Sequence, residues 1–257
     1  MSAGVVVTGG GGGIGAALAR RFAAEGARVV VADLNGDAAA EVAAEVGGTA
    51  FAGDVASEDG VAKLIAAARE TLGEIDVFCA NAGIAPFGGE QSTEEDWART
   101  WDVNVMAHVR ASRLLLPAWL ERGQGHFIAT VSAAGLLTSL GSAPYSVTKH
   151  GALAFAEWLS ATYRHRGITV QAICPQGVRT AMLESTGERG KLLMEASAIE
   201  PAQVADALFT AIEEKRFLVL PHEEVAQYYA VRATQTDRWL GGMNKLQRKM
   251  EALPEDA

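Results

Sequence analysis

The sequence predicts an α/β fold: a parallel seven-stranded sheet with helices on both faces. Short runs of branched apolar residues alternate with longer helical patterns, which is typical of strand–helix–strand units. The runs are apolar along their whole length, as strands covered on both faces are. With 257 residues, 49% of them hydrophobic and 21% charged, the chain is expected to form one large domain with a substantial core.

Each expected strand is an apolar run, and each expected helix has an apolar stripe or a recognisable start. The strands are expected at 4–8, 28–33, 49–53, 75–79, 125–131, 167–173 and 217–220. The helices are expected at 16–26, 37–46, 57–72, 93–120, 145–165 and 201–215. Thr93, followed by three acids, is typical of a helix cap, and Pro201 of a first helical position.

Two segments fall outside this alternation. Residues 176–200, after Pro175, are expected to form a loop with one short helix, a candidate lid. Residues 222–250 predict a mostly charged helix, broken at Gly241-Gly242, that packs on the outside or on a neighbouring subunit. No linker, low-complexity run or fixed repeat divides the sequence, so a single domain over 1–257 is predicted.

Composition argues against several classes of partner. The net charge of −9 argues against nucleic-acid binding and gives no support for an anionic membrane surface. No apolar run approaches the roughly 20 residues that span a bilayer. Cys79 and Cys174 each end an apolar run and are expected to be buried, in a reducing, cytoplasmic compartment and without metal-ligand spacing. Met1 leads directly into the first strand, so no signal peptide is expected.

The turn after the first strand is rich in glycine. Gly10, Gly12 and Gly15 fit G-x-G-x-x-G; Thr8-Gly9, Gly13 and Gly15 fit T-G-x-x-x-G-x-G. Either pattern lets the backbone approach a pyrophosphate at the positive end of a helix. The glycines alone also suit a flexible turn. A preceding strand, a following helix and an acid about 20 residues further on favour a dinucleotide site.

That acid, Asp33, is the most discriminating residue of the cofactor site. A carboxylate at the end of the second strand accepts hydrogen bonds from the adenosine ribose hydroxyls and repels a 2′-phosphate. The neighbouring Leu34 and Asn35 offer no positive charge to such a phosphate. NAD is therefore favoured over NADP. The alternative is a surface acid that caps the next helix.

Further polar residues end the next two strands. Asp54 is placed to hold the adenine amino group, Val55 offers a backbone contact, and Asn81-Ala82-Gly83 follows the fourth strand. Ligands of parallel sheets bind outside the carboxyl ends of the strands. The convergence of these residues on one sheet edge predicts a single cofactor crevice.

Residues Ser132, Tyr145 and Lys149 carry the predicted chemistry. Ser132 closes the fifth strand, and Tyr145 and Lys149 lie four apart on one face of a helix. A nearby ammonium favours the phenolate and lowers a tyrosine pKa from about 10. A hydroxyl beside such a phenol can exchange a proton with an alcohol or ketone oxygen. Taken alone, the pair also suits a lysine extended along a half-buried ring, and the serine a turn.

Together these residues resemble the short-chain dehydrogenase/reductase family. The matching pieces, in the expected order over residues 4–180, are Thr8-Gly9, Gly13-Ile14-Gly15, Asp33, Asp54, Asn81-Ala82-Gly83, Asn104, Ser132, Tyr145, Lys149 and 175–180. The resemblance implies a doubly wound Rossmann-type domain. It also implies a homodimer or homotetramer joined through the helices that carry Asn104 and Tyr145.

The resemblance also implies roles. Tyr145 is the catalytic acid/base, Lys149 lowers its pKa and holds the nicotinamide ribose, Ser132 orients the substrate oxygen, and Asn104 positions a water in a proton relay. The expected cofactor-binding residues are Gly9, Gly12, Gly13, Ile14, Gly15, Asp33, Leu34, Asp54, Val55, Asn81, Ala82, Gly83, Tyr145, Lys149, Pro175, Gly177, Val178 and Thr180. The last two are expected to meet the nicotinamide carboxamide.

One departure concerns the loop after the sixth strand. The family usually has Pro-Gly-x-Val-x-Thr, whereas this chain has Pro175-Gln-Gly-Val-Arg-Thr180, with the glycine one place later. The loop length is kept, so the contacts of Val178 and Thr180 are expected to survive. We expect Gln176 to project into the substrate pocket as a polar contact.

The predicted function is hydride transfer between NAD(H) and a secondary alcohol or ketone. The expected pocket wall is apolar or small, which favours an apolar, cyclic or aromatic substrate. It comprises Ala133, Ala134, Leu136, Leu137, Met182 and Leu183, with Ser132, Tyr145 and Gln176 as polar contacts. Two alternatives stay open: an NADP-dependent 3-oxoacyl or carbonyl reductase, and a catalytically silent nucleotide-sensing protein. Asp33 argues against the first, and the intact Ser132, Tyr145 and Lys149 against the second.

Overall fold

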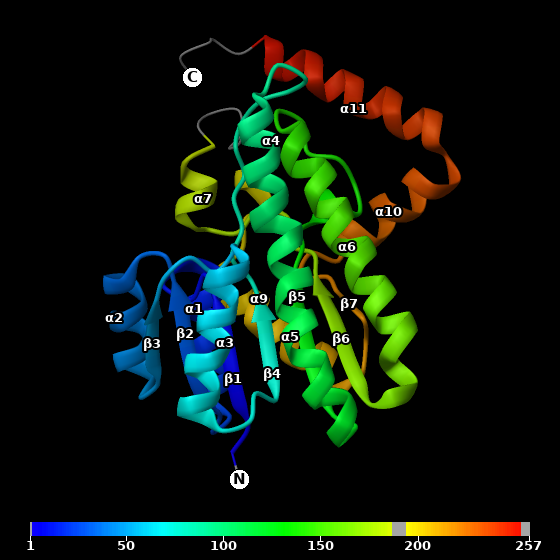
Figure 1. Ribbon diagram of the computed structural model, residues 1–257. Helices are drawn as coiled ribbons and strands as arrows, with labels where there is room; N and C mark the ends of the chain where they lie inside the picture. The colour runs from blue at the N-terminus through cyan, green and yellow to red at the C-terminus, as the bar shows by residue number, and fades with distance from the viewer. Residues whose placement is uncertain (1, 187–193, 253–257) are drawn as a thin grey trace.

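A computed structural model describes residues 2–186 and 194–252 of the chain. Seven parallel strands form one sheet in the order β3-β2-β1-β4-β5-β6-β7, with helices on both faces, which confirms the predicted fold class (Figure 1). The strands are β1 (Gly4–Thr8), β2 (Arg28–Asp33), β3 (Thr49–Ala52), β4 (Val77–Ala80), β5 (Gly125–Thr130), β6 (Ile168–Ile173) and β7 (Leu218–Val219). Each lies within a few residues of its predicted position.

The helices follow the predicted alternation. They are α1 (Gly13–Ala24), α2 (Gly36–Val46), α3 (Glu58–Leu72), α4 (Glu94–Trp101), α5 (Ala107–Arg122), α6 (Ala143–Tyr163), α7 (Ala181–Glu184), α9 (Pro201–Glu213), α10 (Glu224–Thr234) and α11 (Thr236–Glu251). The predicted cap at Thr93 is present: its hydroxyl accepts from the Asp96 N–H at 3.1 Å, and the Asp96 side chain accepts in return. Pro201 opens α9 as expected.

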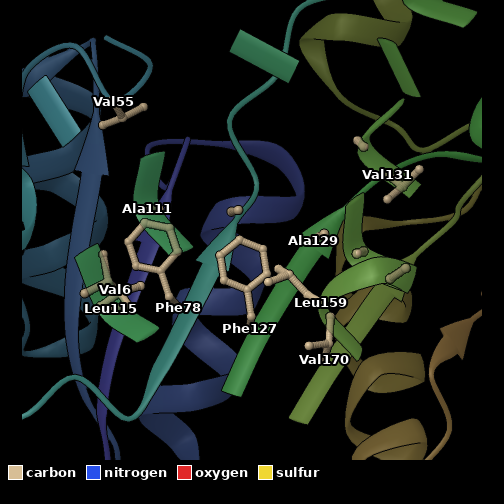
Figure 2. Close-up of a cluster of buried hydrophobic side chains, with 14 of the residues drawn as sticks. Val6, Val55, Phe78, Ala111, Leu115, Phe127, Ala129, Val131, Leu159 and Val170 are labelled. Carbon is tan, nitrogen blue, oxygen red and sulfur yellow. The ribbon is translucent and has the colours of Figure 1, made fainter. Parts of the chain in front are cut away.

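The sheet separates two apolar layers. Helices α1, α2 and α9 pack on one face, and α3, α5 and α6 on the other. On the second face the rings of Phe78 (β4) and Phe127 (β5) stack with centroids 6.0 Å apart (Figure 2). Burial of such large apolar side chains from both strands fixes the register of β4 against β5.

The chain reverses its winding direction between β1 and β4. It moves from β1 outward to β3 and then crosses back to β4 on the other side of β1. This reversal opens a crevice at the carboxyl ends of β1 and β4, where ligands of such sheets bind. The glycine turn that follows β1 borders this crevice.

Two predicted helices differ from the structure. The helix expected over 93–120 is interrupted by a π-helical turn, Asp102–Met106, which contains Asn104. The break expected at Gly241-Gly242 lies instead at Gln235, and both glycines are helical within α11. Glycine costs a helix about 1 kcal/mol per residue, and tertiary packing of one helix face can offset that cost.

The candidate lid is only partly described. It contains α7 and a short 3-10 turn, Glu195–Ser197, while 187–193 lie outside the described residues. Farther along the chain, α11 crosses above α4 and α6 at the end of the molecule where the crevice opens (Figure 1). None of the helices in the described part of the chain combines the length and apolar character needed to cross a membrane.

Candidate active site

A cleft of about 1460 Å³ opens at the carboxyl edge of the sheet. Most of the predicted site residues line it: Gly9, Gly12, Gly13, Ile14, Asp33, Leu34, Asp54, Val55, Asn81, Ala82, Gly83, Ser132, Ala133, Ala134, Leu137, Tyr145, Lys149, Pro175, Gln176, Gly177, Val178, Thr180, Met182 and Leu183. Three predicted residues do not: Gly15 and Asn104 lie behind the cleft wall, and Leu136 belongs to the core.

The glycine turn is set by close backbone packing. A Cβ on Gly15 would lie 2.0 Å from the carbonyl oxygen of Gly9, so no side chain fits there. Gly13 has a φ of 51°, which favours glycine. Helix α1 begins at this turn and presents free N–H groups at its positive end to the cleft. The turn therefore offers what a pyrophosphate needs.

Two carboxylates border the cleft. Asp33 accepts from the N–H of Gly11 at 2.9 Å and of Asn35 at 3.0 Å, which holds its carboxylate at the tip of β2. Asp54 accepts from the N–H of Ala56 at 2.8 Å. Burial acts to raise the pKa of Asp54, but these backbone and side-chain donors outweigh it and the pKa lies below its ordinary value. Both carboxylates line the cleft as hydrogen-bond acceptors.

Two asparagines tie the crevice together. The Asn81 side chain donates to the carbonyl oxygens of Thr8 and Gly9 at 3.0 and 3.2 Å, which joins β4 to the glycine turn. Asn104 is fully buried; it exchanges hydrogen bonds with the backbone of Ile84 and donates to the Thr148 hydroxyl at 3.0 Å. Its side chain thus connects the segment after β4 to α6.

Ser132 follows β5 in a strained backbone conformation. Its φ of 145° is rare for any residue other than glycine and costs free energy. The Ser132 hydroxyl accepts from the Ala134 N–H at 3.1 Å and lies 3.5 Å from the carbonyl oxygen of Pro175. The turn therefore points the hydroxyl into the cleft beside Tyr145.

Tyr145 and Lys149 lie on α6 as predicted, both largely buried. Lys149 Nζ lies 5.5 Å from the Tyr145 ring centroid and donates to the carbonyl oxygen of Thr130 at 2.9 Å. Burial lowers the pKa of Lys149 to about 8. Burial raises the pKa of Tyr145 above its ordinary value, although the Ser132 hydroxyl opposes the rise.

Lys149 was expected to lower the pKa of Tyr145. Within the chain, desolvation of the phenolate raises that pKa, and the opposing contribution comes from the Ser132 hydroxyl. The side chains alone therefore keep Tyr145 protonated. Tyr145, which lines the cleft, can therefore donate its proton as an acid.

Sequence reasoning missed a buried histidine, His108, which lies on α5. His108 is 1% exposed, and neither ring nitrogen has a hydrogen-bond partner among the described residues. Burial, with a smaller contribution from the charge of Lys149, lowers the pKa of His108 to about 3. The imidazole is therefore neutral at any working pH and adds no second charge beside Lys149.

The loop after β6 closes over the glycine turn. The Thr180 side chain lies against Gly13, where an added Cβ would be 2.9 Å from Thr180 Cγ2. Thr180 also caps α7 through the Leu183 N–H at 3.4 Å. The contact of Thr180 with Gly13 is consistent with the expectation that Thr180 keeps its place although the glycine of the loop is displaced.

The substrate side of the cleft includes a wall that sequence reasoning missed. Helix α11 contributes Trp239, Met243, Leu246 and Met250, spaced by four, three and four residues. Such spacing places them on one helix face. The segment was predicted to pack on the outside or on a neighbouring subunit; most of α11 is exposed, and the prediction missed that an apolar stripe among its charges lines the cleft.

Comparison with known proteins identifies the family. Residues 3–191 match the model of the short chain dehydrogenases. The chain belongs to the short-chain dehydrogenase/reductase family. It is an oxidoreductase that acts on alcohol groups, transferring a hydride between a secondary alcohol or ketone and a nicotinamide cofactor.

Two of the similar curated relatives are dehydrogenases. A 1-deoxy-11-beta-hydroxypentalenate dehydrogenase from Streptomyces exfoliatus is 37% identical over 229 residues, covering 85% of this chain and 82% of the relative. A meso-2,3-butanediol dehydrogenase from Serratia marcescens is 34% identical, covering 83% and 89%.

A solved structure shares the fold. The short chain dehydrogenase/reductase from Burkholderia phymatum in complex with NAD has a TM-score of 0.84 and 26% identity over 92% of this chain and 94% of that chain. A 3-ketoacyl-(acyl-carrier-protein) reductase from Brucella melitensis, complexed with NADH, has a TM-score of 0.78 and 26% identity over 85% and 96%.

Proposed function

We propose that this protein is an NAD-dependent dehydrogenase of a secondary alcohol, or reductase of the matching ketone, on an apolar cyclic substrate. One observation carries the proposal: Ser132, Tyr145 and Lys149 line the same cleft as the glycine turn and Asp33. Asp33 supports NAD over NADP, since a carboxylate at the tip of β2 accepts hydrogen bonds from ribose hydroxyls and repels a 2′-phosphate. The relatives named above are dehydrogenases of hydroxyl compounds, a hydroxypentalenate and a butanediol.

 The 2,5-dichloro-2,5-cyclohexadiene-1,4-diol dehydrogenase of Sphingobium indicum, 36% identical over 70% of this chain and 74% of that protein, supports a cyclic substrate.

Each residue has a defined task in this proposal. Tyr145 Oη exchanges the proton with the substrate oxygen, and the Ser132 hydroxyl orients that oxygen. Lys149, whose ammonium is held by the Thr130 carbonyl, binds the nicotinamide ribose. Asn104 positions a water in a proton relay to bulk solvent. The cofactor, when bound, supplies the hydride-transferring ring and, in its oxidised form, a positive charge that favours the phenolate.

The remaining cofactor contacts belong to the same proposal. The backbone of Gly9 to Gly15 binds the pyrophosphate, Asp54 and Val55 bind the adenine, and Val178 with Thr180 contacts the carboxamide. We also propose that residues 1–257 form one domain and that the protein resides in the cytoplasm, where its two buried cysteines stay reduced.

A homodimer or homotetramer joined through α4, α5 and α6 completes the proposal. It is supported by large apolar side chains that these helices expose: Trp101 (42%), Val147 (49%) and Trp158 (54%). Light scattering of the purified protein tests it, and a monomer at micromolar concentration would contradict it.

The test of function is a turnover assay. The protein is mixed with NAD or NADP and a panel of cyclic and open-chain secondary alcohols, and with NADH or NADPH and the matching ketones, while nicotinamide absorbance is followed. We expect turnover of cyclic compounds with NAD(H). Preference for the phosphorylated cofactor would support the 3-oxoacyl or carbonyl reductase alternative. Cofactor binding without any turnover would support the nucleotide sensor.

A further inference from the structure

Two buried nitrogen atoms in residues of the cleft wall have no partner. Gln176 Nε2 and Trp239 Nε1 are inaccessible to solvent and form no hydrogen bond with the residues that the structure describes. Both residues line the cleft. Buried N–H groups are almost always paired, because an unmade hydrogen bond costs free energy. Each is therefore an unsatisfied donor in a residue that borders the cleft.

The glycine of this loop is required at position 177, which leaves position 176 free to carry the side chain of Gln176. A Cβ at Gly177 would lie 2.6 Å from the carbonyl oxygen of Met194, so position 177 admits only glycine. The flanking backbone is fixed as well: the Ile199 N–H donates to Gly177 at 3.1 Å, and the Arg179 N–H donates to Ile199 at 2.9 Å. Of the two long polar side chains in this loop, Gln176 lines the cleft and Arg179 does not.

His222 holds Gln176 in place. The backbone N–H of Gln176 donates to His222 Nδ1 at 3.2 Å, so Nε2 of the same ring carries the proton. That Nε2–H donates to the carbonyl oxygen of Ser197 at 3.0 Å. His222 is only 4% exposed. One neutral imidazole thus connects the loop after β6, the end of the candidate lid and the approach to α10.

The second donor belongs to another element. Trp239 lies on α11, next to the apolar side chains of Met243 and Leu246 that also line the cleft. Helix α10, which precedes α11, is tied to the active-site loop by a hydrogen bond from Arg232 to the carbonyl oxygen of Leu136. A donor surrounded by apolar groups discriminates strongly, because a ligand that lacks the matching acceptor leaves it unpaired.

We propose that the substrate carries at least one acceptor oxygen apart from the one at the reacting carbon, and that Gln176 Nε2 and Trp239 Nε1 are donors for such oxygens. The substrate class is a cyclic alcohol or ketone with an additional carbonyl, hydroxyl or carboxylate group. His222 is a positioning residue that sets Gln176. This inference rests on the proposed function and deepens it.

The test compares substrates that differ only in the second oxygen. The value of kcat/KM is measured for cyclohexanol and for a cyclohexanediol, a hydroxycyclohexanone and a hydroxycyclohexanecarboxylate. We expect the wild-type protein to prefer at least one oxygenated compound by about tenfold or more. Gln176→Leu, which keeps the size and removes the donor, should reduce that preference about tenfold, and Trp239→Phe should also reduce it. Equal losses for cyclohexanol and the oxygenated compounds would overturn the proposal.

His222 offers a matched pair of variants. In His222→Asn the amide stands near the place of Nδ1 and can accept from Gln176; in His222→Gln it stands near Nε2 and can bond only Ser197. We expect the asparagine variant to keep the preference and the glutamine variant to lose it through a higher KM for the oxygenated compound. The opposite order, or equal behaviour, would refute the positioning role.

The two proposals fail in different ways. Turnover of cyclohexanol without any preference for a second oxygen would overturn this inference and leave the dehydrogenase function standing. Absence of turnover with every compound would refute the proposed function. In that case calorimetric binding of cyclohexanone and of an oxocyclohexanecarboxylate, compared between wild type and Gln176→Leu, still decides whether Gln176 recognises the second oxygen.

Discussion

The two ends of the cleft are built differently. The cofactor end consists mainly of backbone at the tips of β1, β2 and β4, all within the first 83 residues. The substrate end consists mainly of side chains from α4, α7, α10 and α11, drawn from residues 87–250. Binding at the cofactor end depends on how closely the backbone approaches the ligand, whereas binding at the substrate end depends on apolar side-chain surface.

This difference determines what each end tolerates. Where backbone meets backbone, one added methyl group has no space. Where side chains meet a ligand, truncation changes which ligand fits and leaves the sheet intact. Mutations at the two ends should therefore separate effects on stability and cofactor binding from effects on substrate affinity.

The largest effect is expected at the cofactor end, from Gly15→Ala. Its Cβ would lie 2.0 Å from the Gly9 carbonyl oxygen. The clash should lower the free energy of unfolding by about 3 kcal/mol or more, measured by urea titration. Gly12→Ala is the control, because nothing lies within 4 Å of an added Cβ there. It should weaken cofactor binding while stability changes little; equal stability of the two variants would contradict the packing argument.

Replacement of Asp33 should change which cofactor is used. Asp33→Ser removes the carboxylate that accepts ribose hydroxyls and repels a phosphate. We expect the preference for NAD over NADP, measured as a ratio of kcat/KM, to fall about 100-fold, which corresponds to about 2.7 kcal/mol. An unchanged ratio would show that Asp33 serves only to hold the glycine turn through Gly11.

The buried His108 should make the free energy of unfolding depend on pH. Its pKa is lowered to about 3 in the folded protein, from 6.5. The unfolded chain therefore binds the proton first, and stability falls as pH falls from about 6.5 towards 3. His108→Leu should remove about 2 kcal/mol of the loss between pH 7 and pH 5, measured by urea titration at each pH. His165→Leu, at an exposed position, controls for the loss of a histidine as such. An identical pH dependence in His108→Leu and wild type would contradict the burial argument.

The smallest effect is expected at the substrate end. Met243→Ala should raise the KM of a cyclic substrate about tenfold while the cofactor affinity stays within about threefold. Leu240→Ala, on the same helix but outside the cleft and 56% exposed, should leave KM unchanged. Equal effects of the two truncations would show that α11 does not contact the substrate.

The sequence predicted that Asp33, Asp54 and Asn81 share one crevice, and all three line the same cleft. They lie at or just after the ends of β2, β3 and β4, and parallel strands bring such ends to one edge. No comparable rule links Gln176 to His222, 46 residues apart, or Trp239 to the cleft. The apolar stripe of α11 was present in the sequence, but only the fold shows which surface it covers.

The direction of the Tyr145 pKa escaped prediction for another reason. Helix spacing shows that an ammonium lies near the phenol, but it does not show how completely both are desolvated. In the structure burial raises the pKa of Tyr145 and lowers that of Lys149, because it disfavours the charged form of each group. Competition between charge and desolvation is decided by tertiary packing.

The central claim is that the Tyr145 hydroxyl exchanges the proton at the reacting carbon's oxygen. Turnover and cofactor affinity of Tyr145→Phe, measured side by side, test it most directly. The account predicts that kcat falls by about 10² to 10⁴ while the dissociation constant of the cofactor stays within about threefold of wild type. Turnover in this variant at the wild-type rate would contradict it.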